Sequence, residues 1–436
     1  MLVRLLTMLI QGRRLEILEL AALVVLLPQL IVALGPGGLG ALVVAEGSAG
    51  LVCALVRRMT GRQRLGPSAT AALAVVVAGT AGVVGAASPT HMAALCLAAL
   101  GAGPRARAST YLQGASAGTI RALGGGAALA RLATAAMLAG PHVGVVLVAA
   151  SWLLVDVVAL RWAASLRHTR SSDAGSPGPQ RNDDPAPTTA ANAPTGPDPA
   201  WVMWHLDEVL IAAVAGLAAV APWAIGAWVI GRVMGLAALL ERATLPLPLP
   251  RVPDGHAWRR AFDATVFGGL AIAVPVTVFS ASFARLYFGV RAPWLGLFGV
   301  VVVVAAAHRA AVRGTTLAKL TPQGAGSLPQ WHLVAALVGV VILGPPGALL
   351  ATIATLTTST ARLLQVVHQA LPGANTHATQ RLLALAGPAA AGLVVGATLL
   401  AVKPPADVQT ALLEAGVTGI LTSAACFATF QISGRG

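Results

Sequence analysis

Residues 33–58 read ALGPGGLGALVVAEGSAGLVCALVRR, a Gly/Pro turn followed by an apolar segment with one carboxylate, Glu46, near its middle. A second stretch, residues 219–244 (AVAPWAIGAWVIGRVMGLAALLERAT), aligns with the first at an offset of 186. This alignment places a basic residue, Arg232, opposite the acidic Glu46. Because the same turn and apolar span occur twice, the sequence predicts a chain built from two repeats.

The composition is that of an integral membrane protein. The mean hydropathy is +0.78, and 56% of the residues are hydrophobic while only 10% are charged, against about 25% charged in soluble domains. The net charge of +14 does not indicate nucleic acid binding, because the arginines lie in short segments between apolar runs, where they set membrane topology. The three cysteines have no metal-ligand or disulfide spacing, so we expect no metal site and no cofactor.

Apolar segments separated by Gly/Pro turns predict an all-α, polytopic membrane protein of about 14 transmembrane helices, with 12 as the alternative count. Each repeat has an even number of spans, so both enter the membrane from the same side as two parallel six-helix repeats. The polar, Pro-rich segment between them has the composition of a disordered linker. The expected domains are a first six-helix bundle (1–164), a disordered cytoplasmic linker (165–200), a second six-helix bundle (201–368) and two additional C-terminal helices (369–436).

The distribution of basic residues predicts the orientation of the chain. With the N-terminus inside, 24 of the 29 Lys and Arg residues fall in cytoplasmic segments, and three fall outside. Positive charge accumulates in cytoplasmic loops, so we expect a multi-pass protein of the bacterial cytoplasmic (inner) membrane with both termini in the cytoplasm. The turns at Gly35-Pro36, Ala221-Pro222 and Gly344-Pro345 are then external.

Several short motifs have the order and spacing found in one transporter family. They are Leu34-Gly35-Pro36 with Gly40, Gln113-Gly114 with Arg121, Leu138 to Ala149, Leu286 to Gly289, and Gly344 to Ala351. Over most of its length the chain resembles the polysaccharide flippases of the multidrug/oligosaccharidyl-lipid/polysaccharide exporter superfamily. The resemblance implies a transporter that moves a lipid-linked saccharide or similar amphipathic lipid across the membrane by alternating access.

Two other functions remain open at this point. A major facilitator-type small-molecule exporter also has two six-span halves, but its usual acidic-basic motif after span two is absent, since residues 57–64 (RRMTGRQR) contain no acid. The second alternative is a non-transporting membrane scaffold, in which the cytoplasmic linker would be the functional segment. We do not expect an enzyme, because no Ser/His/Asp set, paired carboxylates or metal spacing is present.

Four ionisable residues inside the predicted spans are the candidate cavity residues: Glu46, Arg131, Asp156 and Arg232. A charge in mid-membrane costs roughly 2.5–3.5 kcal/mol, so each requires a cavity or a partner. Glu46 and Arg232 lie ten residues beyond their turn prolines, and the repeat predicts that they face one cavity, where they bind substrate or a coupling cation. For Arg131, Asp156 and the less securely placed Asp263 and Glu414, a structural ion pair or an interfacial position is the simpler interpretation.

The expected partners follow from these interpretations. They are the lipid bilayer, a lipid-linked saccharide substrate and a coupling cation, and the protein is expected to be a monomer.

Overall fold

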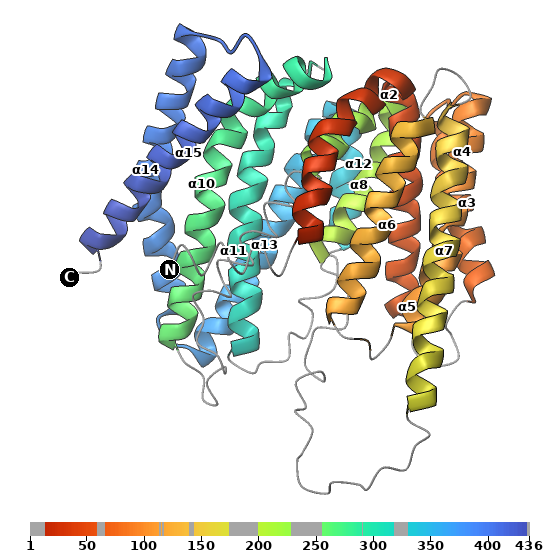
Figure 1. The fold of residues 1–436 in the computed structure, drawn as a ribbon. Coiled ribbons are helices and arrows are strands. Elements are labelled where there is room, and N and C mark those ends of the chain that lie inside the picture. Colours follow the sequence, from red (N-terminus) through yellow and green to blue (C-terminus); the bar gives the residue numbers. More distant parts are fainter. Residues whose placement is uncertain are drawn as a thin grey trace, which may run out of the picture. The chain divides into compact units, whose positions relative to one another are not determined.

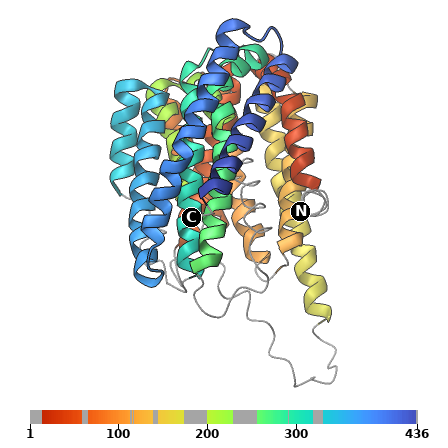
Figure 2. The same ribbon diagram turned by 90° about the vertical axis from the view of Figure 1, so that its left-hand side faces the viewer.

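The computed structural model describes residues 14–58, 66–112, 115, 117–138, 144–173, 199–227, 255–289, 291–317 and 330–433. Within these ranges the chain is helical apart from short turns, and no strand is present. The helices form two compact units, an N-terminal unit (Arg13–Ala221) and a C-terminal unit that contains Pro222–Gly436. Figures 1 and 2 show the helices of each unit running side by side.

The N-terminal unit contains seven of these helices. They are α2 (Arg14–Arg58), α3 (Pro67–Val84), α4 (Pro89–Leu100), α5 (Ala102–Tyr111), α6 (Ala117–Leu138), α7 (Gly144–Asp173) and α8 (Pro199–Ala215).

In the described part of the C-terminal unit lie six full α-helices, a short 3-10 helix at Pro293–Gly296 and the end of a helix at Leu217–Ala227, which begins in the N-terminal unit. The α-helices are α10 (Gly255–Phe288), α11 (Leu297–Leu317), α12 (Gln330–Leu343), α13 (Pro345–Ala370), α14 (Ala374–Val402) and α15 (Val408–Ser433).

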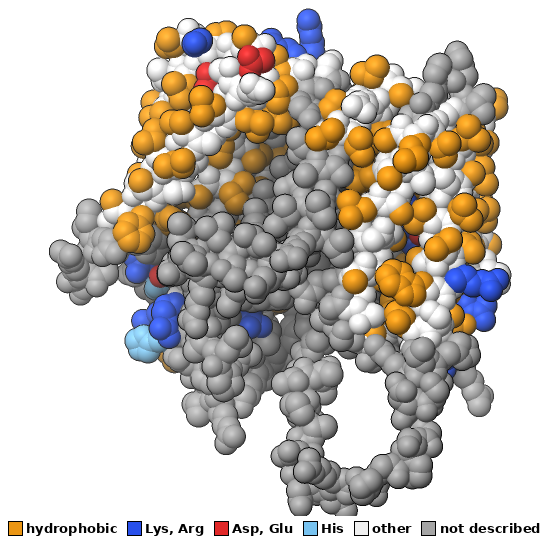
Figure 3. Space-filling view, viewed as in Figure 1, with side chains coloured by type: hydrophobic (Ala, Val, Ile, Leu, Met, Phe, Trp, Pro, Cys, Tyr) orange, Lys and Arg blue, Asp and Glu red, His pale blue; other side chains and the backbone are white. Residues whose placement is uncertain are grey.

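Seven described helical segments are long and apolar enough to cross a bilayer, and three shorter apolar helices accompany them. Large hydrophobic side chains are exposed on many of these helices, and Figure 3 shows hydrophobic side chains along α14 and α15 and, in the other unit, along α7. The predicted fold class is therefore confirmed, and the chain is an all-α, polytopic membrane protein. The span count of 14 and the relation between the repeats stay predictions, because residues 228–254, which include Arg232, lie outside the described residues.

Two of the three turns predicted above lie where the helices break. Gly35 has a φ of +69° inside α2, and the kink is visible at the upper end of α2 in Figure 1. Gly344 has the same φ and separates α12 from α13. The prediction of a turn at Ala221-Pro222 is wrong, because residues 217–227 are helical and the break falls at Gly216, whose φ is +84°. Only glycine adopts these left-handed angles without strain.

Residues 201–221, which the sequence assigned to the second bundle, lie in the N-terminal unit. Glycines allow this packing: a Cβ at Gly40 would lie 1.8 Å from the carbonyl oxygen of Leu217, and one at Gly85 would lie 2.2 Å from that of Ala212. Small residues are the usual means by which membrane helices approach closely.

Residues 165–173 and 199–200 of the predicted linker 165–200 are helical, as parts of α7 and α8. α7 continues to Asp173, because neither proline nor glycine interrupts the chain between Gly144 and Gly175. Residues 174–198 lie outside the described residues.

The core of the C-terminal unit is organised around one stripe of α10. Trp258, Phe262, Val266 and Leu270 follow one another at four-residue spacing, which places them on one helix face. They pack against α11 and α13, and the indole nitrogen of Trp258 donates a hydrogen bond to the carbonyl oxygen of Ala310 at 3.3 Å. This packing fixes the rotation of α10 and so determines which side chains its other faces present.

Candidate functional site

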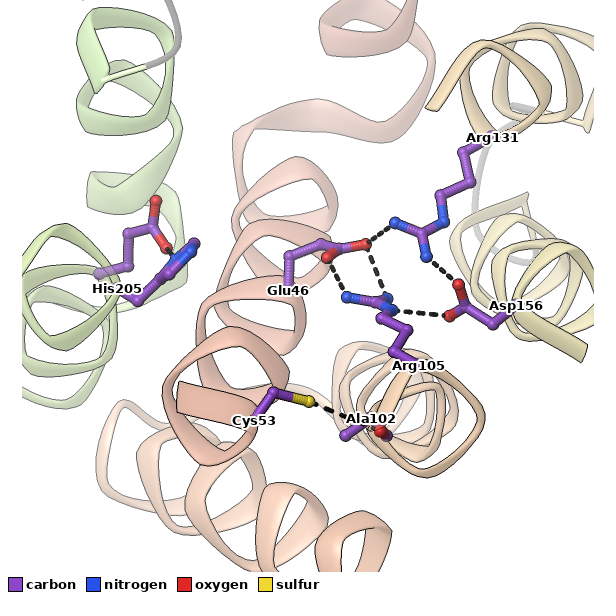
Figure 4. Close-up of polar contacts among 8 residues, drawn as sticks. Glu46, Cys53, Ala102, Arg105, Arg131, Asp156 and His205 are labelled. Atoms are coloured by element: carbon purple, nitrogen blue, oxygen red, sulfur yellow. Dashed lines mark hydrogen bonds and ion pairs between the residues drawn. The ribbon is translucent and has the colours of Figure 1, made fainter. Parts of the chain in front are cut away.

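Four charged side chains from four helices of the N-terminal unit form a closed set of ion pairs, which we call the charged ring: Glu46 of α2, Arg105 of α5, Arg131 of α6 and Asp156 of α7 (Figure 4). Arg105 binds both carboxylate oxygens of Glu46, with a distance of 2.9 Å from Nη2 to Oε1, and its Nε donates to Asp156 Oδ2 at 2.9 Å. Arg131 Nη1 donates to Glu46 Oε1 at 2.7 Å, and its Nη2 donates to Asp156 Oδ1. Each arginine therefore bridges both carboxylates.

The two carboxylates of the ring lie near the middle of the candidate membrane spans of α2 and α7. At a rise of 1.5 Å per residue, Glu46 is about 15 Å along the helix from Pro36, and Asp156 is about 18 Å from Gly144. The hydrocarbon core of a bilayer is about 30 Å thick. Both carboxylates are thus near mid-depth, where a single charge without a partner is costly.

The ring is balanced in charge but unevenly buried. Two carboxylates face two guanidinium groups, so the ring has no net charge when all four groups are ionised. The side chain of Asp156 is only 2% exposed, whereas that of Glu46 is 26% exposed. Asp156 is therefore the fixed acid of the ring, and Glu46 is the one that solvent or a ligand can reach.

Gly101 makes room for the Asp156 carboxylate between α4 and α5. A Cβ at this position would lie 2.2 Å from Asp156 Oδ2 and 3.3 Å from Arg105 Nη2. A second contact holds α5 against α2, where the Cys53 thiol donates a hydrogen bond to the carbonyl oxygen of Ala102 at 3.6 Å. The absence of a side chain at Gly101 is what allows Asp156 to reach Arg105.

α7 positions Arg131 through two side chains one helical turn apart. Trp152 and Asp156 have i, i+4 spacing and therefore share a face. The Trp152 indole nitrogen donates to the carbonyl oxygen of Arg131 at 3.1 Å, and the Arg131 guanidinium carbon lies 5.9 Å from the centre of the Trp152 ring. Ser151 also donates to the Thr134 hydroxyl at 3.1 Å, which ties α6 to α7 beside the ring.

A second acidic group lies next to Glu46 on α8. Glu208 is 4% exposed and pairs with His205 of the same helix, with 2.8 Å between His205 Nδ1 and Glu208 Oε2. A Cβ at Gly47 would lie 2.5 Å from Glu208 Oε2, so this carboxylate packs directly on the α2 backbone beside Glu46. Asp207 is also buried on α8. The neighbourhood of Glu46 thus contains two further acids, Asp156 and Glu208, and one histidine in addition to the two arginines.

The structure brings together three of the four candidate residues that the sequence singled out: Glu46, Arg131 and Asp156. The fourth, Arg232, lies outside the described residues, so its predicted proximity to Glu46 stays a prediction. Of the two less secure candidates, Asp263 lies in the C-terminal unit and pairs with His377 and Arg381, and Glu414 lies half-buried on α15.

Sequence reasoning missed Arg105, which it placed in a cytoplasmic segment. Gly101, Gly103 and Pro104 indicate the end of a span, but in the structure Gly101 has helical angles and Pro104 is the third residue of α5. Proline is tolerated there because the amide groups of the first turn have no intrahelical acceptor. The available signal was charge balance, since Glu46 and Asp156 carry two negative charges deep inside apolar runs and Arg131 alone does not balance them.

Among the described residues no group of three or more His, Cys, Asp or Glu side chains could hold a metal ion. In the ring the carboxylates are paired with arginines, whose positive charge is unsuitable for a metal site. The guanidinium groups can instead exchange one anionic partner for another.

No family model matches the chain, and no curated protein matches it. It is similar to a solved structure described as the inward-facing conformation of a multidrug resistance MATE family transporter of the MOP superfamily. The TM-score is 0.42 at 13% sequence identity, over 83% of this chain and 95% of that chain.

Proposed function

We propose that this protein is a membrane transporter that moves a lipid-linked saccharide, or a similar amphipathic lipid with a phosphate-containing head group, across the cytoplasmic membrane by alternating access. The observation that carries the proposal is the charged ring, in which four charged side chains from four helices pair with one another inside one helical unit. The sequence resemblance to polysaccharide flippases supports the class of substrate.

A ring of this kind is a poor way to build a static core. Ions removed from water lose several kcal/mol of solvation each, and replacing a buried ion pair by apolar side chains is often neutral or stabilising. Intramembrane charges of this kind mark substrate and ion pathways more often than they serve packing. The partial exposure of Glu46 favours the same interpretation, since a ligand can reach its carboxylate.

The charge balance suggests how the ring works. When Glu46 is ionised, Arg105 and Arg131 are both occupied and the ring is neutral. When Glu46 takes up a proton or a coupling cation, the two arginines retain Asp156 as their only anionic partner within the ring, and the ring has a net positive charge. A diphosphate group can then replace the Glu46 carboxylate, because guanidinium groups bind phosphate in the same two-pronged manner as carboxylate.

Other charged groups face Glu46 and contribute to its protonation. The arginines of α5 and α6 favour its ionised form, while Asp156 of α7 and Glu208 of α8 oppose it. His205, which is paired with Glu208 at 2.8 Å, adds positive charge when it is protonated. The proposal therefore assigns the coupling step to Glu46, whose carboxylate belongs to the ring and is partly exposed.

The test is a flipping assay with the purified full-length protein in phosphatidylcholine vesicles. The probe is a polyprenyl diphosphate saccharide with a fluorescent label on the sugar, and an impermeant reductant destroys the label on the outer leaflet. We expect the wild-type protein to make the inner pool accessible, whereas Arg105→Gln abolishes this because the diphosphate loses one of its two guanidinium partners.

The matched control is Arg107→Gln, because Arg107 lies on the same short helix but is exposed and hydrogen bonds to Tyr111. This variant should flip the probe at the wild-type rate. Failure of the folded wild-type protein to flip the probe would contradict the proposal. Transport of small water-soluble solutes alone would identify an exporter instead, and no transport by a correctly folded protein would leave the scaffold function.

A further inference from the structure

A second cluster of charged side chains lies in the C-terminal unit and shares no residue with the charged ring. It lines a cavity of about 470 Å³, which is within the usual range for small-molecule sites. The lining residues are His256, Arg259, Arg260, Asp263, His377 and Arg381. Three arginines face one aspartate, so the cavity has a positive charge even when both histidines are neutral.

Two helix N-termini meet at this cavity. The residues from α10 come from its first turns after Gly255, and His377 and Arg381 come from the first turns of α14 after Gly373. The N-terminal end of a helix has a partial positive charge and unpaired amide groups, which favour anions. Both helix ends therefore add to the positive potential that the arginines create.

The single aspartate is already occupied. Asp263 Oδ1 lies 2.9 Å from His377 Nε2, and Asp263 Oδ2 lies 3.5 Å from Arg381 Nε. The His377 ring is further held by Trp258 and Phe262, with ring centres 6.0 and 6.2 Å away. Asp263 thus joins α10 to α14, and Arg259 and Arg260 add two further positive charges to the cavity lining.

The two arginines of α10 are placed differently. Arg259 is half-buried, and its Nη2 lies 3.4 Å from the position of a Cβ on Gly373, so it extends over the turn that precedes α14. Arg260 is exposed. Figure 3 shows Lys, Arg and His side chains gathered at this end of α10. The two side chains present guanidinium groups from adjacent positions toward one opening.

We propose that this cavity is a phosphate-binding site that takes one phosphate or diphosphate group, either from a free anion or from the head group of a membrane lipid. The chemistry is specific to oxyanions, because guanidinium groups and helix N-termini both donate several N–H groups to phosphate oxygens. The positive-inside distribution of the sequence places this end of α10 on the cytoplasmic side, where both sources are present. The proposal is independent of the flipping function, since it concerns other residues in the other unit.

The experiment uses the full-length protein in nanodiscs and has two arms. In the first, inorganic pyrophosphate is titrated into nanodiscs of phosphatidylcholine and the heat of binding is measured. In the second, the thermal unfolding midpoint is compared between nanodiscs of phosphatidylcholine alone and of an equal mixture with phosphatidic acid. Binding in the first arm identifies a free anion as a ligand, and stabilisation in the second arm alone identifies a lipid head group.

The test variants are Arg259→Gln/Arg260→Gln and, with one charge removed, Arg260→Gln, and the control is Arg285→Gln, which removes one positive charge near the other end of α10. We expect the double variant to bind pyrophosphate at least about tenfold more weakly, or to lose the stabilisation by phosphatidic acid, because charge-assisted hydrogen bonds to the anion disappear. The control should match the wild-type protein.

Arg260→Gln alone covers the case in which the double variant does not fold, because an exposed side chain contributes little to packing. This single variant should weaken pyrophosphate binding or reduce the stabilisation by phosphatidic acid, whichever of the two responses the wild-type protein shows. Absence of any response in both arms, or an equal loss of binding in Arg285→Gln, would overturn the proposal.

Discussion

Gly101→Ala should be strongly destabilising, although alanine is the better helix former. A methyl group at this position would lie 2.2 Å from Asp156 Oδ2, which is far inside van der Waals contact. The carboxylate cannot move aside cheaply, because it is 2% exposed and bound on two sides by Arg105 and Arg131. The substitution therefore forces Asp156 out of the charged ring.

The magnitude follows from two opposing contributions. Breaking a buried ion pair costs about 3–5 kcal/mol, and replacing glycine by alanine in a helix returns roughly 0.5–1 kcal/mol. We expect a net loss of about 2–4 kcal/mol in the free energy of unfolding. The measurement is denaturant unfolding of the purified protein in detergent, with the midpoint and slope compared between variants.

Gly124→Ala on α6 is the matched control, because no atom lies within 4 Å of the Cβ that it would add. This variant should gain up to about 1 kcal/mol from the change in helix propensity. The two substitutions thus have opposite expected signs. Equal stability of the two variants would refute the placement of the Asp156 carboxylate against Gly101.

Three further predictions concern charge balance, a helix cap and topology. Arg105→Gln should cost about 3–5 kcal/mol of unfolding free energy because it leaves the ring with excess negative charge. Adding Glu46→Gln should recover part of this loss, and no recovery in the same unfolding assay would contradict the paired arrangement. The Asp407 carboxylate accepts a hydrogen bond from a backbone amide in the first turn of α15, which lowers its pKa below its ordinary 3.8. The stability difference between the wild-type protein and Asp407→Ala should therefore be present above pH 3.8 and disappear as the pH falls through the lowered value. A difference that persists in unfolding curves at lower pH would rule this out. Cysteines introduced at Ser172 and Thr195 in a cysteine-free background should be protected from an impermeant thiol reagent in intact cells, because the distribution of basic residues predicts a cytoplasmic segment here. Labelling at these positions would reverse the predicted orientation.

Composition and the cost of intramembrane charge were enough to select three members of the charged ring. Glu46, Arg131 and Asp156 each interrupt an apolar run that is long enough to enter the membrane, and such residues require partners. The partners themselves were not predictable from local sequence. Arg105 is 59 residues from Glu46 and Arg131 is 85 residues from it, and contacts at this separation depend on helix rotation and packing.

The repeat directed attention from Glu46 to Arg232, because symmetry was the only long-range relation visible in the sequence. In the structure Glu46 already has two arginine partners within its own unit.

The helix breaks also show how far local sequence predicts the structure. Gly35 and Gly344 could be identified because their left-handed backbone angles favour glycine, whereas Pro222 was misleading, since Gly216 six residues earlier supplies the break.

The measurement that tests the central claim most directly is the affinity of the protein for a polyprenyl diphosphate saccharide as a function of pH, in the wild-type protein and in Glu46→Gln. Both proteins should also contain Arg259→Gln/Arg260→Gln, so that the second cavity does not contribute. Glu46→Gln reproduces the neutral form of the acid and leaves the ring positively charged. We expect it to bind the diphosphate more tightly than the wild-type protein at neutral pH and to lack the increase in affinity that acidification produces in the wild-type protein. Equal or weaker binding by Glu46→Gln at neutral pH would contradict the exchange of the Glu46 carboxylate for the substrate phosphate.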